Sequence, residues 1–135
     1  MAVNNFINHR LGLYKIAHDL TEDGNFIDID YSVSEHGHIL VKKGKEYFKI
    51  LTKALSDLAP IPISENEFNS LDKFTHIFLI TGICTENCDK NYERFSIPMG
   101  DAKTKIKTNY GPDGKPNHWI HPSQYLNYKV SKFKV

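Results

Sequence analysis

The chain has 135 residues, of which 40% are hydrophobic and 24% are charged. This size and composition are typical of one globular domain with a continuous core, and they exclude a disordered chain, a collagen-like repeat and a coiled coil. With 17 basic and 16 acidic residues the net charge is +1, so the chain as a whole is not strongly polarised.

The first part of the chain predicts a segment that is either a helix or a strand, followed by a β-hairpin. Apolar residues over 3–20 recur at roughly helical spacing, but Gly12 weakens a helix and the same segment could equally open a strand. Residues 27–34 alternate between apolar and polar side chains, as expected of a half-buried strand. A turn at Gly37, which can adopt a positive φ, then leads into a second strand at 39–42.

The middle of the chain predicts the main helix and the central strand. Residues 45–59 have the spacing of an amphipathic helix, which Pro60 and Pro62 would end. Residues 64–67 predict a short helical turn that begins with a capping box, and the continuous apolar run over 75–83 predicts a fully buried strand. The residues expected on the apolar face of the main helix are Tyr47, Leu51, Ala54, Leu55 and Leu58.

Short strands and loops are expected beyond the central strand. Residues 94–97 and 103–108 predict strands, and residues 109–117 form the clearest loop of the chain because they are dense in turn-forming residues. Residues 119–120 and 126–135 could close the sheet.

Together these elements predict a single α+β domain over residues 1–135, in which a mostly antiparallel sheet packs against one main helix at 45–59. The chain has no phosphate-binding Gly-rich loop, no nucleophile elbow and no zinc-protease helix. Those absences exclude nucleotide hydrolases, serine hydrolases and zinc proteases in their usual forms.

Neither secretion nor a membrane anchor is indicated. The first ten residues lack an apolar stretch after a basic leader, and the longest apolar run, at 77–80, is far too short to span a bilayer. The two cysteines are too few for a disulfide scaffold. We therefore expect a cytoplasmic protein with no membrane partner, in a bacterium or a phage-infected cell.

The basic residues are concentrated in the last third of the chain. From Arg94 to Val135 there are eight basic residues against two acidic ones, a net charge of +6, whereas residues 1–93 carry nine against fourteen, a net charge of −5. If 103–108 is a strand, its three lysines share one face, and such lysines either bind an anion or only prevent edge-to-edge aggregation. Lysines that contact phosphates and aromatic rings that stack on bases are typical of proteins that bind RNA or another phosphate-bearing ligand. The nucleic-acid-binding candidates are Arg94, Lys103, Lys105, Lys107, Lys115, Tyr110 and Trp119.

Seven histidines are many for this length, and several lie in or beside predicted turns. A ribonuclease that works without a metal needs one imidazole to take the 2′-hydroxyl proton and a second to protonate the leaving oxygen. It also needs a cation to stabilise the charge that builds on the phosphate. The sequence predicts that His118 and either His36 or His38 are the acid and the base. It predicts Lys105 as the cation. The hypothesis is a small metal-independent endoribonuclease with no cofactor.

A zinc-stabilised binding domain is an alternative. Cys84 and Cys88 are four residues apart, His118 and His121 are three apart, and together they could form a tetrahedral Cys₂His₂ site. The 29 residues between the pairs exceed the spacing of a compact zinc finger. If the second pair lies on a strand, its two histidines point to opposite faces, which argues against shared ligation.

The competing class is a non-catalytic protein-binding module, such as an inhibitor or immunity protein of a bacterial or phage conflict system. Small size, mixed surface charge and the absence of a firm catalytic motif fit that class. Its candidate contacts are Asp28, Asp30, Glu35 and the turn at 21–24.

Overall fold

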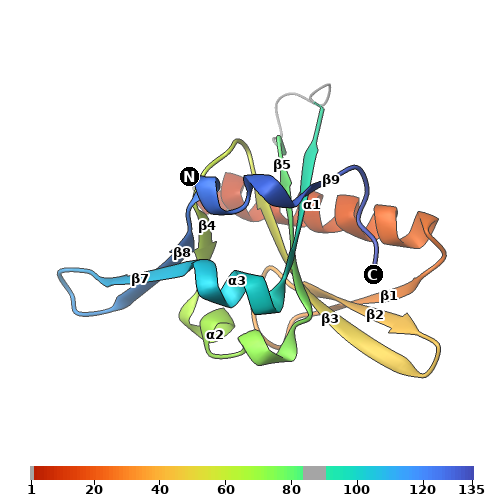
Figure 1. The fold of residues 1–135 in the computed structure, drawn as a ribbon, viewed down its shortest axis with the longest axis horizontal. Helices are drawn as coiled ribbons and strands as arrows, with labels where there is room; N and C mark the ends of the chain where they lie inside the picture. The colour runs from red at the N-terminus through yellow and green to blue at the C-terminus, as the bar shows by residue number, and fades with distance from the viewer. Residues whose placement is uncertain (1, 84–90) are drawn as a thin grey trace.

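The structure is a computed structural model that describes residues 2–83 and 91–135 (Figure 1). In chain order the elements are α1 (Ala2–Glu22), β1 (Phe26–Asp30), β2 (His38–Lys43), β3 (Glu46–Leu55), β4 (Ile61–Ile63), α2 (Glu65–Phe68), η1 (Leu71–Lys73), β5 (His76–Thr81), β6 (Glu93–Pro98), α3 (Met99–Lys105), β7 (Ile106–Tyr110), β8 (Pro116–Ile120), η2 (Pro122–Gln124), η3 (Leu126–Tyr128) and β9 (Lys129–Val130).

The strands form two sheets. The larger has the order β1-β2-β3-β5-β6-β9, and the smaller has the order β4-β8-β7. Within the described residues β3 and β5 are the one parallel pair, and the other neighbours are antiparallel. The fold is therefore α+β with a mostly antiparallel sheet, as the sequence predicted. The β7–β8 hairpin projects at one end of the molecule, and the β2–β3 hairpin lies at the other end (Figure 1).

Helix α1 is the main helix, and it covers one face of the larger sheet. Leu13, Ile16 and Leu20 are fully buried against apolar side chains of β2, β3 and β5. Burial of each such side chain contributes about 1.5–3 kcal/mol. Gly12 lies directly against Ala54 of β3, where a side chain would have no room. The glycine that weakens the helical pattern is thus what lets the helix approach the sheet.

The opposite face of the larger sheet packs under the smaller sheet and the short helices. This second core contains Leu51, Ile77 and Leu79 of the central strands, together with Ile61 and Ile120 of the smaller sheet. Strands β3 and β5 are therefore covered on both faces, which is the environment predicted for residues 75–83.

The helix predicted at 45–59 is wrong, because β3 occupies most of that segment. The strand is buried on both faces, so apolar side chains fall on both sides and their spacing also fits a helix. Ile50 and Ala54 pack under α1, while Leu51 packs on the opposite face. Lys53, which a helix would expose, is buried.

The strand predicted at 103–108 is also only partly right. Residues 99–105 form α3, and the strand begins at Ile106. Lys103 and Lys105 therefore lie on a helix and Lys107 on a strand, so the three lysines do not form the predicted single face.

Several local predictions are confirmed. Strands β1 and β2 form the expected hairpin, and Gly37 has a positive φ of 84°. Ser64 caps α2, where its hydroxyl accepts from the Glu67 amide and the Glu67 carboxylate accepts from the Ser64 amide. Near the C-terminus, Lys129–Val130 adds a two-residue strand to the edge of the larger sheet at β6.

Candidate functional site

A cavity of about 450 Å³ lies where α1, the β1–β2 loop, β3, α2 and β8 meet. This volume is in the range of small-molecule binding sites in proteins. The chain contributes three histidines, one lysine and two glutamates to its walls, from segments far apart in the sequence. The lining residues are His9, Ser34, His36, Lys53, Pro60, Pro62, Ile63, Ser64, Glu65, Glu67, Pro116, Asn117, His118 and Trp119.

A buried ion pair forms part of the cavity wall. The Lys53 Nζ lies 2.6 Å from the Glu67 Oε1, and both side chains are 6% exposed. Burial alone would raise the pKa of Glu67, but the Lys53 ammonium and the hydrogen bonds from Ser64 hold that pKa below its usual range. A charge pair taken out of water at a cavity is costly, and such pairs are enriched at functional sites.

Two stacked imidazoles form another part of the wall. The rings of His9 and His36 lie 4.3 Å apart with an interplanar angle of 22°. Burial, followed by the nearby Lys53 and His36, lowers the pKa of His9 to about 4, so His9 is neutral at pH 7. The His36 Nδ1 is buried and has no hydrogen-bond partner among the described residues.

The loop that carries His36 is held against α1 by Arg10. The guanidinium donates to the Glu35 carbonyl over 3.1 Å, and it lies 4.7 Å from the centre of the Tyr31 ring. It also lies 5.0 Å from the centre of the Phe6 ring. These contacts fix the position of His36 at the cavity.

His118 is held rigidly in the wall formed by β8. Its ring stacks on Phe68 with 3.8 Å between the ring centres, and its side chain is 3% exposed. The Nε2 lies 2.9 Å from the Glu65 Oε2, and the Nδ1 lies 2.7 Å from the Thr108 Oγ1. An ionised carboxylate only accepts, so neutral His118 carries its proton on Nε2 and accepts from the Thr108 hydroxyl at Nδ1. His118 and Glu65 therefore form one carboxylate–imidazole pair, whose carboxylate side chain is 50% exposed.

The structure brings together His36 and His118 of the predicted catalytic residues, but not the other two. His38 is fully buried against the Phe74 ring, and its Nε2 lies 3.4 Å from the Asp30 Oδ2 without hydrogen-bond geometry. Lys105 lies on α3, where its Nζ is 5.6 Å from the centre of the Tyr128 ring. The cation in the cavity is instead Lys53.

Three cavity residues were not indicated by the sequence, namely Lys53, His9 and Glu65. Lys53 is not among the residues on the apolar face of the helix predicted at 45–59, so that prediction gives it no place in a buried site. The signal that could have identified it is a single lysine in the otherwise apolar run of β3. His9 lies in the segment whose element type the sequence left open, so its side-chain direction was not predictable.

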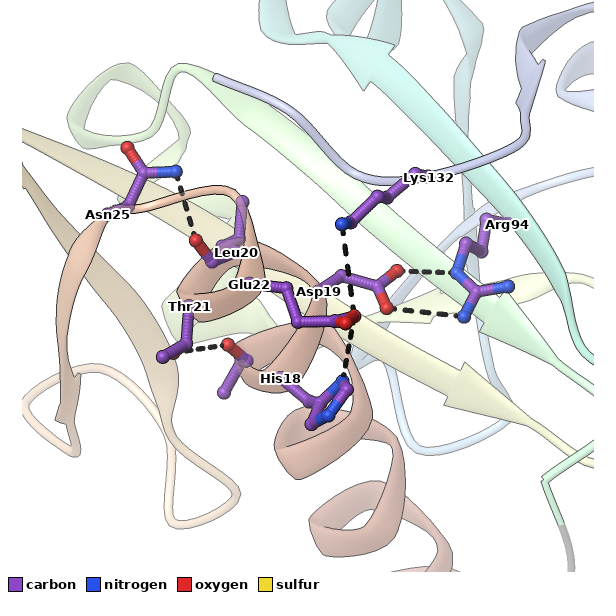
Figure 2. A network of polar contacts seen from close by, with 9 residues as sticks. His18, Asp19, Leu20, Thr21, Glu22, Asn25, Arg94 and Lys132 are labelled. Carbon is purple, nitrogen blue, oxygen red and sulfur yellow. Dashed lines mark hydrogen bonds and ion pairs between the residues drawn. The ribbon is translucent and has the colours of Figure 1, made fainter.

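The predicted nucleic-acid-binding residues are dispersed over the molecule. Arg94 is paired with Asp19 through its Nε at 2.5 Å and a second nitrogen at 3.2 Å (Figure 2), and Lys103 is paired with Asp72. Three of the seven remain exposed on the β7–β8 hairpin, and Trp119 lines the cavity. The exposed three are Lys107, Tyr110 and Lys115.

The arrangement of the histidines does not favour the predicted zinc site. Cys84 and Cys88 lie outside the described residues. Both ring nitrogens of His118 already have partners, and the exposed His121 binds Ser123 through its Nδ1. The two imidazoles are therefore not presented to a common ion.

The described residues include one cluster with possible metal ligands, formed by His18, Asp19 and Glu22. Figure 2 shows that Asp19 is engaged by Arg94, while Glu22 lies between His18 at 3.4 Å and Lys132 at 3.8 Å. Because basic groups already neutralise both carboxylates, the cluster ties α1 to β6 and the C-terminal segment.

The acidic residues proposed for a protein interface lie near the first hairpin. Asp28 is exposed, whereas the Asp30 Oδ1 accepts from the Ser32 amide. The side chain of Glu35 is exposed, and the turn at 21–24 is exposed at the end of α1. Of these residues, Asp28 lines a hollow formed by β1, β2 and β3, apart from the histidine-lined cavity.

Comparison with protein-family models, with curated proteins and with solved structures finds no match for this chain. Among the described residues, no helix combines the length and the apolar character needed to cross a bilayer. What the protein does must therefore be inferred from the cavity and its chemistry.

Proposed function

We propose that the protein is a metal-independent endoribonuclease, and that the histidine-lined cavity holds the phosphodiester to be cut. The observation that carries this proposal is the convergence of His36, the Glu65–His118 pair and Lys53 on one cavity. These groups come from four separate segments, and together they offer two proton-transfer groups and a cation.

In the proposed reaction the Glu65–His118 pair takes the proton from the 2′-hydroxyl of the substrate. The 2′-oxygen forms a bond to phosphorus, and the bond from phosphorus to the 5′-oxygen of the next nucleotide breaks. His36, as an imidazolium, gives its proton to that leaving oxygen. The products are a 2′,3′-cyclic phosphate and a free 5′-hydroxyl, so protons and charge balance without a metal or a cofactor.

The geometry suits the Glu65–His118 pair to the role of base. The carboxylate is half exposed, while the imidazole behind it is fixed by Phe68 and Thr108. The Nε2–H of neutral His118 donates to Glu65 over 2.9 Å and orients the carboxylate, which itself accepts the proton. General acid–base catalysis of this kind contributes about 10²–10⁴-fold in rate.

Lys53 is the group that would stabilise negative charge on the phosphate. Its ammonium is held in place by Glu67, in a site with little access to water, where electrostatic interactions are strong. The two glutamates that line the cavity outnumber its one lysine, so these three charges together would repel a phosphate. The imidazolium at His36 therefore serves both as acid and as a second positive charge.

The β7–β8 hairpin supports the proposal, because it extends from the cavity and carries exposed basic and aromatic side chains. Asn117, His118 and Trp119 of β8 line the cavity. Lys107 and Tyr110 on the neighbouring strand are exposed. An RNA strand that leaves the cavity could follow this hairpin, with lysines near its phosphates and Tyr110 near a base.

The proposal is tested by cleavage of single-stranded RNA in EDTA. We expect His36→Asn and Glu65→Gln each to lose 10²–10⁴-fold in rate, because each removes one proton-transfer group. His118→Ala should also abolish cleavage, but it leaves a gap beside Phe68, so Glu65→Gln tests the same pair without that gap. His121→Asn is the matched control, since His121 is exposed and lies outside the cavity. Unchanged cleavage in the His36 and Glu65 variants, with folding verified by circular dichroism, would contradict the proposal.

A protein-binding module is the second candidate, and one feature of α1 favours it. Ile7, Leu11 and Tyr14 recur at helical spacing and are all exposed, with Tyr14 52% exposed. An exposed apolar stripe of this kind is typical of a partner-binding helix. A folded wild-type protein that cuts no RNA would favour this candidate over the ribonuclease.

A further inference from the structure

Strands β1, β2 and β3 of the larger sheet lie at the end of the molecule away from the β7–β8 hairpin (Figure 1). Phe26, Lys42 and Tyr47 are register partners on β1, β2 and β3, so the three side chains stand in one row on one face. The neighbouring side chains Ile27, Val41 and Phe48 belong to the core under α1. The row therefore lies on the face that points away from α1.

The aromatic side chains of this row are unusually accessible. Phe26 is 79% exposed and Tyr47 is 59% exposed. They flank a hollow of about 360 Å³, which also includes Asp28 and Leu40 of the next row. The Lys42 Nζ lies 5.9 Å from the centre of the Tyr47 ring. Two open rings about 10 Å apart, with a lysine between them, have the dimensions to stack on bases of one strand.

The charges around the row favour a phosphate-bearing strand. The turn from β2 to β3 carries Lys42, Lys43 and Lys45 against Glu46, so the tip of the hairpin is cationic. Asp28 is the one carboxylate in the hollow among the described residues. A carboxylate at that place can accept from the exocyclic amino group of a base, as it does from cytosine.

We propose that this aromatic row is a binding surface for single-stranded nucleic acid, with Phe26 and Tyr47 as stacking platforms. The lysines of the turn contact phosphates, and Asp28 favours a base with an exocyclic amino group over one without it. The surface requires no cleavage, so it stands whether or not the cavity is an active site.

The row and the cavity lie on the same face of β3. Tyr47 and Lys53 are an even number of residues apart on that strand, so their side chains leave the same face, and the separation along the strand is about 20 Å. If the cavity cuts RNA, this surface would hold a part of the strand several nucleotides from the cut.

The test is fluorescence polarisation with labelled single-stranded DNA decamers of deoxycytidine and of deoxythymidine. DNA has no 2′-hydroxyl, so binding is measured without the proposed reaction. We expect Phe26→Ser and Tyr47→Ser each to weaken binding of the deoxycytidine decamer by about five-fold to a hundred-fold, the effect of losing one stacked base. Tyr14→Ser is the matched control, because this exposed tyrosine lies on α1, on the other face of the sheet.

Two further results separate this surface from general electrostatic attraction. The wild type should bind the deoxycytidine decamer more tightly than the deoxythymidine decamer, and Asp28→Asn should reduce that preference. Equal loss of binding in the Tyr14, Phe26 and Tyr47 variants, or no binding by the folded wild type, would overturn the inference. Cleavage of a dinucleotide, which is too short to reach from the cavity to the row, should be unaffected by Phe26→Ser. That readout distinguishes failure of this surface from failure of the proposed ribonuclease site.

Discussion

Removal of the charge on Glu67 should destabilise the protein strongly. The Lys53–Glu67 pair has an Nζ to Oε1 distance of 2.6 Å, and both side chains are 6% exposed. Glu67→Gln leaves an oxygen that can still accept from the Ser64 amide, so the variant removes the charge and keeps the cap of α2. Lys53 then remains in the wall without a counter-charge, and breaking a buried pair in this way costs about 3–5 kcal/mol.

Urea unfolding followed by circular dichroism at pH 7 measures this cost. Lys53→Met should also destabilise, because it leaves the Glu67 carboxylate without its cation. The double variant should lose less free energy of unfolding than the sum of the single variants, by about 1–3 kcal/mol, because it leaves no buried charge. Additive losses, or a cost below about 1 kcal/mol for Glu67→Gln as for an exposed pair, would refute the reasoning.

Three other predictions concern stability. Burial lowers the pKa of His9 to about 4 and also lowers the pKa of His38, while an unfolded histidine titrates near 6.5. The unfolded chain therefore binds more protons between pH 6.5 and 4, so stability should be full above pH 6.5 and fall on acidification. Urea unfolding at pH 7.5, 5.5 and 4.5 measures this, and a stability that rises on acidification would contradict it. Gly12→Ala should destabilise the protein by about 1–3 kcal/mol, because the added methyl group crowds Ala54. Gly100→Ala, whose methyl group meets no neighbour, should stabilise α3 by up to about 1 kcal/mol. Melting temperatures that shift in the same direction for both variants would exclude this explanation. Asp19→Ala should lower the free energy of unfolding by about 3 kcal/mol, because it leaves the half-buried Arg94 without its partner (Figure 2). Asp113→Ala, at an exposed position, is the control. A change in melting temperature no larger for Asp19→Ala than for this control would rule the explanation out.

The local elements were predictable from the sequence because their signals are local. The hairpin around Gly37 and the capping box at Ser64 depend on a few adjacent residues, and both are present. The buried strand at β5 was predictable because a continuous β-branched run has few other solutions.

The main helix was misplaced because burial on both faces removes the two-residue period of a strand. In β3 the apolar residues continue on both sides, so a helical spacing is found by chance. That single error also moved Lys53 from the cavity wall to the surface. In the same way, the start of β7 at Ile106 separates Lys103 and Lys105 from Lys107.

The cavity itself was only partly predictable. Histidine chemistry indicated His36 and His118, and the fold brings both to one cavity. Their partners depend on tertiary packing, since Glu65 reaches His118 from α2, and His9 reaches His36 from α1. No spacing in the sequence specifies such contacts.

The most direct test of the ribonuclease proposal compares two substrates in EDTA. One is a labelled single-stranded RNA, and the other is the same RNA with every 2′-hydroxyl methylated. The wild type should cut the first and leave 2′,3′-cyclic phosphate ends, which mass spectrometry identifies, and it should leave the methylated strand intact. Cleavage of both substrates, or of neither, would contradict a histidine cavity that cuts RNA through its own 2′-hydroxyl.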